Sequence, residues 1–190
     1  MVGAQLVMLP FDPKDHVATS TALAFQLGGV AYLVGFVVLM LFVVASHEWL
    51  EAGAGLLGAA ATVATVVGTM LLGGDLWFET FAVPWLADEA PSAFDTDPTV
   101  LLAVGALSSY LLFAVGWVLY GVASHRAHVP VAISVAIVIG GALGFQALLS
   151  PWGVPLGLAV GALGVWLIRR KAAPDDRTAT GAGSTEPVLP

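Results

Sequence analysis

The sequence predicts an all-α integral membrane protein: a polytopic bundle of about five transmembrane helices with one short interfacial helix. Of the 190 residues, 58% are hydrophobic and only 10% are charged, and the mean hydropathy is +0.93. A soluble domain carries about a quarter charged residues. The apolar residues also form long blocks without charge, near the length of about 20 residues that a spanning helix needs.

Five apolar blocks are candidates for membrane spans within one domain, residues 18–171. The last block is the shortest, and Pro151 and Pro155 flank its start. Proline is tolerated there because the N–H groups of a first helical turn have no helical partner. We expect the spans at residues 18–45, 50–72, 99–123, 131–149 and 154–168.

An acidic segment, residues 75–98, separates the second and third spans and contains no lysine or arginine. Trp77, Phe81 and Trp85 recur at every fourth position, which places them on one face of a helix. Large aromatic side chains settle at the membrane–water boundary. We therefore expect a short interfacial helix whose start is capped by Asp75. The alternative is a frayed extension of the second span.

Charged residues are missing from the interior of every expected span. Because a buried charge is costly in lipid, such residues usually mark proton relays or ion paths. Their absence argues against proton-coupled transport and intramembrane acid–base catalysis. Asp75 and Glu79, at the expected boundary, are the carboxylates nearest the bundle. We favour a cap and a wet helix face for them, and a cation site is the alternative.

Basic residues orient the bundle by the positive-inside rule. Arg169, Arg170 and Lys171 follow the last span, and Arg126 lies between the third and fourth spans. We therefore expect a multi-pass protein of the cell membrane with a cytoplasmic C-terminus. The acidic segment then lies outside, as does the N-terminus, although Lys14 opposes that placement.

Both ends of the chain differ from the expected domain. Residues 1–17 contain no basic start typical of a cleavable signal peptide, and residues 1–11 are mostly apolar. We interpret this segment as the stump of a further, shortened span. Residues 172–190 are rich in small, polar and proline residues. They have too little apolar surface to fold, which predicts a disordered tail.

Glycines in the last two spans are candidates for helix packing. In lipid, small residues allow two helix backbones to approach closely. The pattern predicts packing within one chain or between copies. The residues concerned are Gly140 and Gly144 in the fourth span, and Gly157, Gly161 and Gly164 in the fifth.

Hydroxyl side chains mark one face of the second span and the middle of the third. They are Thr62, Thr65 and Thr69, then Ser108 and Ser109. We favour interhelical hydrogen bonds, which are worth roughly 0.6 kcal/mol each. The alternative is a polar lane for a small solute.

Histidines are the remaining candidates for a metal or haem site, because the chain has no cysteine. His47, His125 and His128 fall on the same expected side of the membrane. His47 and Glu48 begin a zinc-protease motif, but Glu51 stands where the second histidine is required. We favour solvated residues at helix ends and expect no cofactor.

Several stretches together resemble a broad group of small uncharacterised polytopic membrane proteins of high-GC prokaryotes. In that group an aromatic and acidic segment ends in Ala-Pro, and a later span ends in glycine, then a basic residue and a proline. Gly121, Arg126 and Pro130 occupy those last positions here. The resemblance implies five or six helices and no catalytic residue. It rests on residues 77–91, 116–130 and 163–170.

These observations favour a non-enzymatic membrane protein that acts by helix packing with itself or with a membrane partner. A permease or channel component for a small solute or ion is the first alternative, and a haem- or metal-binding membrane protein is the second. The lipid bilayer is one partner. A formal net charge of −7 does not suit nucleic acid.

Overall fold

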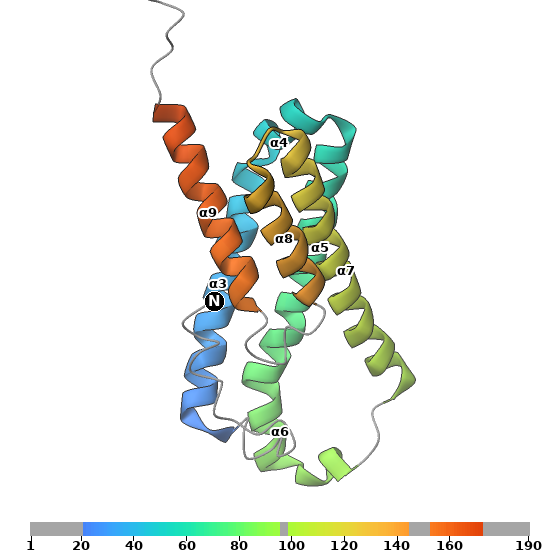
Figure 1. The fold of residues 1–190 in the computed structure, drawn as a ribbon. Coiled ribbons are helices and arrows are strands. Elements are labelled where there is room, and N and C mark those ends of the chain that lie inside the picture. Colours follow the sequence, from blue (N-terminus) through green and yellow to red (C-terminus); the bar gives the residue numbers. More distant parts are fainter. Residues whose placement is uncertain (1–20, 96–98, 145–152, 173–190) are drawn as a thin grey trace, which may run out of the picture.

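The computed structural model describes residues 21–95, 99–144 and 153–172, and every element in this part is helical (Figure 1). The all-α bundle that the sequence predicts is therefore confirmed. The expected segment 1–17 and residues 173–190 of the expected tail lie outside the described residues. The elements are α3 (Leu23–Ala45), α4 (His47–Ala54), α5 (Leu56–Trp77), the π-helix η1 (Phe78–Ala82), α6 (Val83–Glu89), the 3-10 helix η2 (Pro91–Asp95), α7 (Val100–Arg126), α8 (Val131–Leu143) and α9 (Gly153–Ala172).

Four helical runs in the described part are long and apolar enough to cross a bilayer, and the chain is a membrane protein. The fourth expected span, 131–149, begins as the 13-residue helix α8, and residues 145–149 lie outside the described part. The spanning runs are Leu23–Ala45, Leu56–Glu89, Val100–Arg126 and Gly153–Lys171.

The second span begins later than the sequence predicts. The expected start at Leu50 falls inside α4, and the chain breaks at Gly55 before α5 begins at Leu56. Gly55 has φ +60°, a backbone conformation that glycine adopts readily because it has no Cβ. Its N–H donates to the carbonyl of Glu51 at 2.7 Å, which ends α4.

The second span also ends later than expected, and the expected interfacial segment continues it rather than forming a separate helix. From Leu56 to Glu89 the chain forms one run of 34 residues, interrupted only by the π-turn of η1. Pro84 lies in the first turn of α6, where a local π-adjustment accommodates it. The expected alternative, an extension of the second span, is what the structure contains. The aromatic side chains on this extension, Trp77, Phe81 and Trp85, are exposed.

Helices α5 and α7 cross at a pair of glycines. A Cβ on Gly116 would lie 2.7 Å from the Cα of Thr65, and a Cβ on Gly68 would lie 2.6 Å from the Cα of Phe113. Real Cβ atoms essentially never approach so closely. The two backbones therefore touch at this level because neither glycine carries a side chain.

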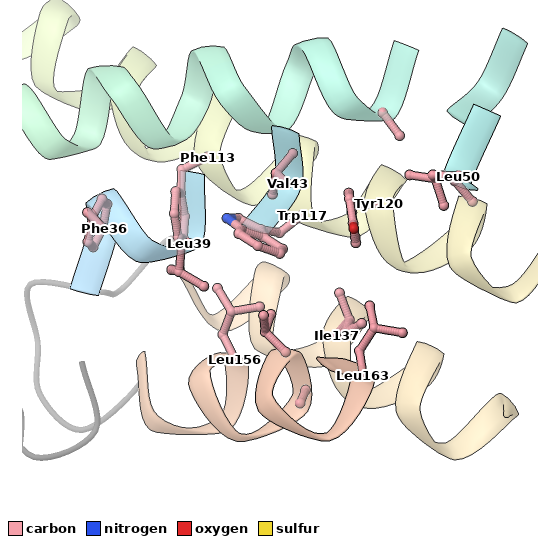
Figure 2. Packing of buried hydrophobic residues seen from close by; sticks show 14 of the residues in the cluster. Phe36, Leu39, Val43, Leu50, Phe113, Trp117, Tyr120, Ile137, Leu156 and Leu163 are labelled. Atoms are coloured by element: carbon pink, nitrogen blue, oxygen red, sulfur yellow. The ribbon is translucent and has the colours of Figure 1, made fainter. Parts of the chain in front are cut away.

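Aromatic side chains fill the centre of the bundle (Figure 2). The ring centroids of Phe36 and Phe113 are 5.6 Å apart, those of Phe113 and Trp117 are 6.2 Å apart, and those of Trp117 and Tyr120 are 5.5 Å apart. All four side chains are buried, and Leu156 of α9 joins the same cluster. This packing joins α3, α7 and α9 into one closed core.

The two ends of the bundle carry opposite charge. At one end, Arg170 lies over the ring of Trp166 at 5.2 Å, and Trp166 packs edge-on against Trp49 of α4 at 6.1 Å. We call this the basic end; Arg126, Arg169 and Lys171 also end their helices there. Helix α6 lies at the opposite end (Figure 1). We call that end the acidic end, and its carboxylates are Asp75, Glu79, Asp88 and Glu89.

Candidate functional site

Asp75 lies inside a continuous helix rather than at a helix start. It occupies the last turn of α5, and the N-cap position of α6 belongs to Ala82. The expected capping role is therefore wrong. The hydroxyl of Tyr110 in α7 instead donates a hydrogen bond to Oδ2 of Asp75 at 2.9 Å. Asp75, like Glu79, Asp88 and Glu89, thus belongs to the helical run Leu56–Glu89, three residues beyond the expected end of the second span.

Tyr110 lies well inside the apolar helix α7, whereas its partner Asp75 lies near the end of α5. At 1.5 Å per residue, Tyr110 is about 15 Å along the helix from Val100. Asp75 is about 28 Å along α5 from Leu56, close to the hydrocarbon thickness of about 30 Å. Glu79 is half-buried on η1, one turn beyond Asp75. The pair therefore lies where the acidic end meets the apolar part of the bundle.

A cavity of about 460 Å³ opens beside this pair, between the end of α5 and the first half of α7. Pockets that hold small molecules have volumes of about 300–1,000 Å³. Most of the lining is apolar, and Asp75 is the ionisable residue within it. The lining residues are Leu71, Asp75, Phe78, Thr99, Leu101, Leu102, Gly105, Ala106 and Ser109.

The two hydroxyls of the lining are engaged with their own helix. Ser109 donates to the carbonyl of Ala106 at 2.7 Å, and Thr99 accepts from the backbone N–H of Leu102 at 3.3 Å. Asp75 is different, because a carboxylate has about four lone-pair positions. The bond from Tyr110 uses one of them, so Asp75 keeps capacity to bind a donor in the cavity.

The glycine crossing explains why a cavity forms at this place. Gly68 and Gly116 hold α5 and α7 in backbone contact. Towards its N-terminal end, α7 then runs away from α5 (Figure 1). The hydrogen bond between Asp75 and Tyr110 spans the widening gap on the acidic side of the crossing.

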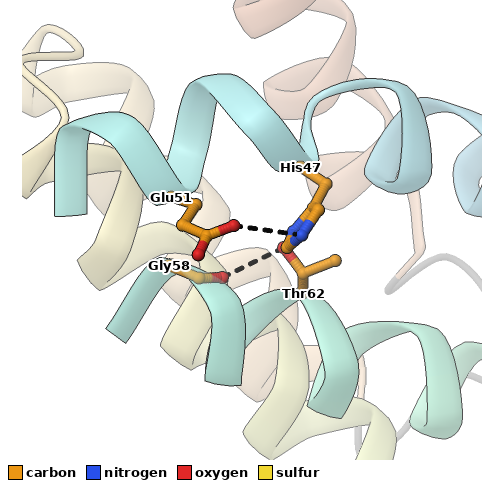
Figure 3. Close-up of polar contacts among 4 residues, drawn as sticks. All are labelled: His47, Glu51, Gly58 and Thr62. Atoms are coloured by element: carbon orange, nitrogen blue, oxygen red, sulfur yellow. Dashed lines mark hydrogen bonds and ion pairs between the residues drawn. The ribbon is translucent and has the colours of Figure 1, made fainter. Parts of the chain in front are cut away.

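The threonine face of α5 packs against α7 in the described structure. Thr65 is fully buried, and its hydroxyl proton is shared between the carbonyl of Gly116, at 2.8 Å, and that of Ala61, at 2.7 Å. Thr62 donates to its own helix at Gly58, at 3.0 Å (Figure 3). Thr69 is also buried. The interhelical bond of Thr65 matches the favoured interpretation.

The two serines of the third span separate in the structure. Ser108 is half-buried and donates to the carbonyl of Gly105 at 2.8 Å. Ser109 is buried and lines the cavity beside Asp75. Only the second therefore belongs to the candidate site.

The three candidate histidines lie at the start of α4 and at or just beyond the end of α7. Nε2 of His47 lies 3.3 Å from a carboxylate oxygen of Glu51, one turn along α4 (Figure 3). His125 is exposed in the last turn of α7, and His128 lies in the turn that follows. Within the described residues, no group of three or more His, Asp or Glu side chains is placed to hold a metal ion.

The glycines of α8 and α9 have different surroundings. A Cβ on Gly140 would lie 2.7 Å from the Cα of Leu156, and a Cβ on Gly144 would meet the ring of Phe113 at 2.6 Å. At Gly164 the nearest atom would be 3.8 Å away, in Phe42, and Gly161 would meet nothing within 4 Å. Gly157 is half-buried.

The sequence does not predict the pairing of Asp75 with Tyr110. The residues are 35 positions apart, and no local pattern sets the register of α5 against α7. The position of Tyr110 in the middle of the third expected span was the available signal, because a buried tyrosine hydroxyl usually finds a partner.

No protein-family model, no curated protein and no solved structure matches the chain. The function is therefore inferred from the geometry of the site.

Proposed function

We propose that this membrane protein is non-enzymatic and binds a small cationic solute beside Asp75, as the solute-binding component of a permease. One observation carries the proposal. The carboxylate of Asp75 lines a cavity between two spanning helices and accepts a hydrogen bond from Tyr110 of the neighbouring span. Ionisable residues in membrane spans are costly and mark ligand or ion sites. A carboxylate selects for positive charge.

The charge pattern around the site supports a cationic solute. No lysine or arginine occurs between Lys14 and Arg126 in the sequence. The acidic end therefore carries carboxylates from α5, η1 and α6 without a neighbouring basic residue on those helices. Such a surface raises the local concentration of cations.

The aromatic core closes the bundle on the side of the cavity that faces the basic end. Beyond the crossing of α5 and α7, Phe113, Trp117 and Tyr120 are buried, and neighbouring rings pack against one another in tilted contact. A solute beside Asp75 thus meets closed packing towards the basic end. We place the basic end in the cytoplasm by the positive-inside rule, so that the cavity lies in the outer half of the cell membrane.

Binding fits the lining better than catalysis does. General acid–base and nucleophilic mechanisms use at least two cooperating groups. The lining offers one carboxylate, and the hydroxyls of Thr99 and Ser109 are engaged with their own helix. The arrangement can hold a charged solute but does not supply an activated nucleophile.

The test is charge displacement in proteoliposomes on a solid-supported membrane. Ammonium, methylammonium, larger amines and alkali cations are applied one at a time. We expect a saturable signal with at least one cation, lost in Asp75→Asn. Asp88→Asn makes the same change at an exposed residue of the acidic end outside the cavity, and its signal should persist. No Asp75-dependent signal with any of these cations would refute the proposal.

Helix packing with a second copy is the other candidate function. Helix α9 packs on α8, yet Gly161 faces open space and its neighbours Leu158 and Val165 are exposed. A self-associating face on α9 would use this small residue. Native mass spectrometry should then show an oligomer that Gly161→Leu dissociates. A monomeric parent protein would exclude this second function.

A further inference from the structure

We propose that the solute is a lipophilic amine, with one ammonium group and an apolar body, and that it enters the cavity from the bilayer. This inference rests on the proposed function, because it names the class of solute that the Asp75 site takes. The geometry of the lining, the charge of the site and the exposure of its rim each support it.

The lining suits an apolar body better than a bare ion. Leu71, Phe78, Leu101 and Leu102, together with Gly105 and Ala106, form most of the wall. Hard metal ions require about six oxygen ligands, whereas the lining supplies one carboxylate and two hydroxyls that are already engaged. An inorganic ion would exchange its hydration shell for hydrocarbon. An organic cation instead buries its apolar part against these side chains.

The charge of the site suits a single ammonium group. Asp75 supplies one negative charge, and its remaining lone pairs accept charge-assisted hydrogen bonds from an N–H donor. Phe78 lines the same cavity, and an aromatic face attracts a nearby cation. The lining contains no second carboxylate, so a second positive charge on the solute would lack a partner there, which is costly.

The rim of the cavity faces the surroundings of the bundle. Leu101 is 83% exposed and Leu102 is 55% exposed. Both lie in the first turn of α7, a helix apolar enough to span the bilayer. A solute that partitions into the bilayer therefore reaches Asp75 between α5 and α7 without crossing the closed aromatic core.

Three ligands with one skeleton test the class: 4-phenylbutylamine, 4-phenylbutanol and 4-phenylbutyrate. Binding is measured by isothermal titration to the full chain in nanodiscs of zwitterionic lipid. The amine should bind saturably, and the alcohol and the acid should bind about tenfold more weakly or worse. Asp75→Asn should lower the affinity for the amine about tenfold or more, whereas Asp88→Asn should leave that affinity unchanged. Equal affinity for amine and alcohol would overturn the proposal.

A second pair of variants keeps the test independent of folding defects. Asp75→Glu retains the charge and should retain amine binding. Leu102→Trp narrows the cavity and leaves Asp75 intact, so it should weaken 4-phenylbutylamine more than methylammonium. Each variant is compared with the parent by thermal unfolding.

The outcomes separate the solute class from the proposed function. If methylammonium or potassium binds in an Asp75-dependent way and 4-phenylbutylamine binds no better, the lipophilic class is wrong and the cation site stands. If no cation depends on Asp75, both inferences fail.

Discussion

The carbonyl of Gly116 accepts a hydrogen bond from Thr65 at the level where Gly116, lacking a Cβ, lies against the Thr65 backbone. One glycine therefore provides both the close approach of α5 and α7 and the acceptor that joins them. This contact fixes the crossing from which α7 diverges to form the cavity.

Gly116→Ala should weaken the α5–α7 crossing. The new Cβ would lie 2.7 Å from the Cα of Thr65 and from the carbonyl oxygen of Ala64, and backbone atoms cannot rotate away. We expect a loss of about 1–3 kcal/mol in the free energy of unfolding, measured by denaturation in mixed micelles. Gly74→Ala is the matched control, because a Cβ there meets nothing within 4 Å. Equal stability of the two variants would contradict the packing described here.

Thr65→Val should cost less than the glycine variant, because it removes a hydrogen bond and keeps the shape. Interhelical hydrogen bonds in membranes are worth about 0.6 kcal/mol on average. The control is Thr62→Val, since Thr62 donates only to Gly58 of its own helix. The same unfolding assay should show a larger loss for Thr65→Val. The reverse order would argue against an interhelical role for Thr65.

His128→Gly should stabilise the protein. His128 has φ +65°, and the turn is closed by bonds from its N–H to His125 and from the N–H of Val129 to Ser124. This is the helix-ending motif that favours glycine at the left-handed position. The left-handed conformation costs a non-glycine residue about 1–2 kcal/mol, part of which the variant recovers. His125→Gly, inside the helix, should lose about 1 kcal/mol. A destabilised His128→Gly variant would contradict the turn geometry.

The fold class was predictable from composition and periodicity alone. Apolar blocks without charge identify spanning helices, because lipid admits few alternatives. The ends of the second span were not predictable, because glycine can either end a helix or continue one. Gly55 ends one helix through its positive φ, whereas Gly73 and Gly74 continue another. The same residue type takes either role according to tertiary packing.

The candidate site was predictable only in part. Asp75 was identifiable as a carboxylate near the bundle, with a cation site as the alternative to a cap. Its partner was not, because Tyr110 reaches it through the register of α5 on α7, which Gly68 and Gly116 set. The cavity depends on the divergence of the same two helices. Neither property is encoded in a local pattern.

Tyr110→Phe tests whether the tyrosine positions Asp75. The variant keeps the ring and removes the hydroxyl that donates to Oδ2. We expect affinity for 4-phenylbutylamine to fall several-fold, by less than in Asp75→Asn, because the charge remains. Tyr120→Phe also removes a buried hydroxyl, one that pairs with Ser46 at 2.6 Å, and should leave the affinity unchanged. Equal losses in the two variants would indicate a general packing effect.

The central claim is that Asp75 lies in an apolar cavity that a cationic solute occupies. Labelling by dicyclohexylcarbodiimide at mildly acidic pH tests it most directly, because this reagent partitions into lipid and modifies protonated carboxyl groups in apolar surroundings. A cation bound beside Asp75 keeps the carboxylate ionised and therefore blocks the reaction. The modified residue is identified by peptide mass spectrometry. We predict that Asp75 is modified, that exposed Asp88 is not, and that 4-phenylbutylamine protects Asp75 while 4-phenylbutanol does not. An unmodified Asp75, or modification that the amine leaves unchanged, would contradict the account.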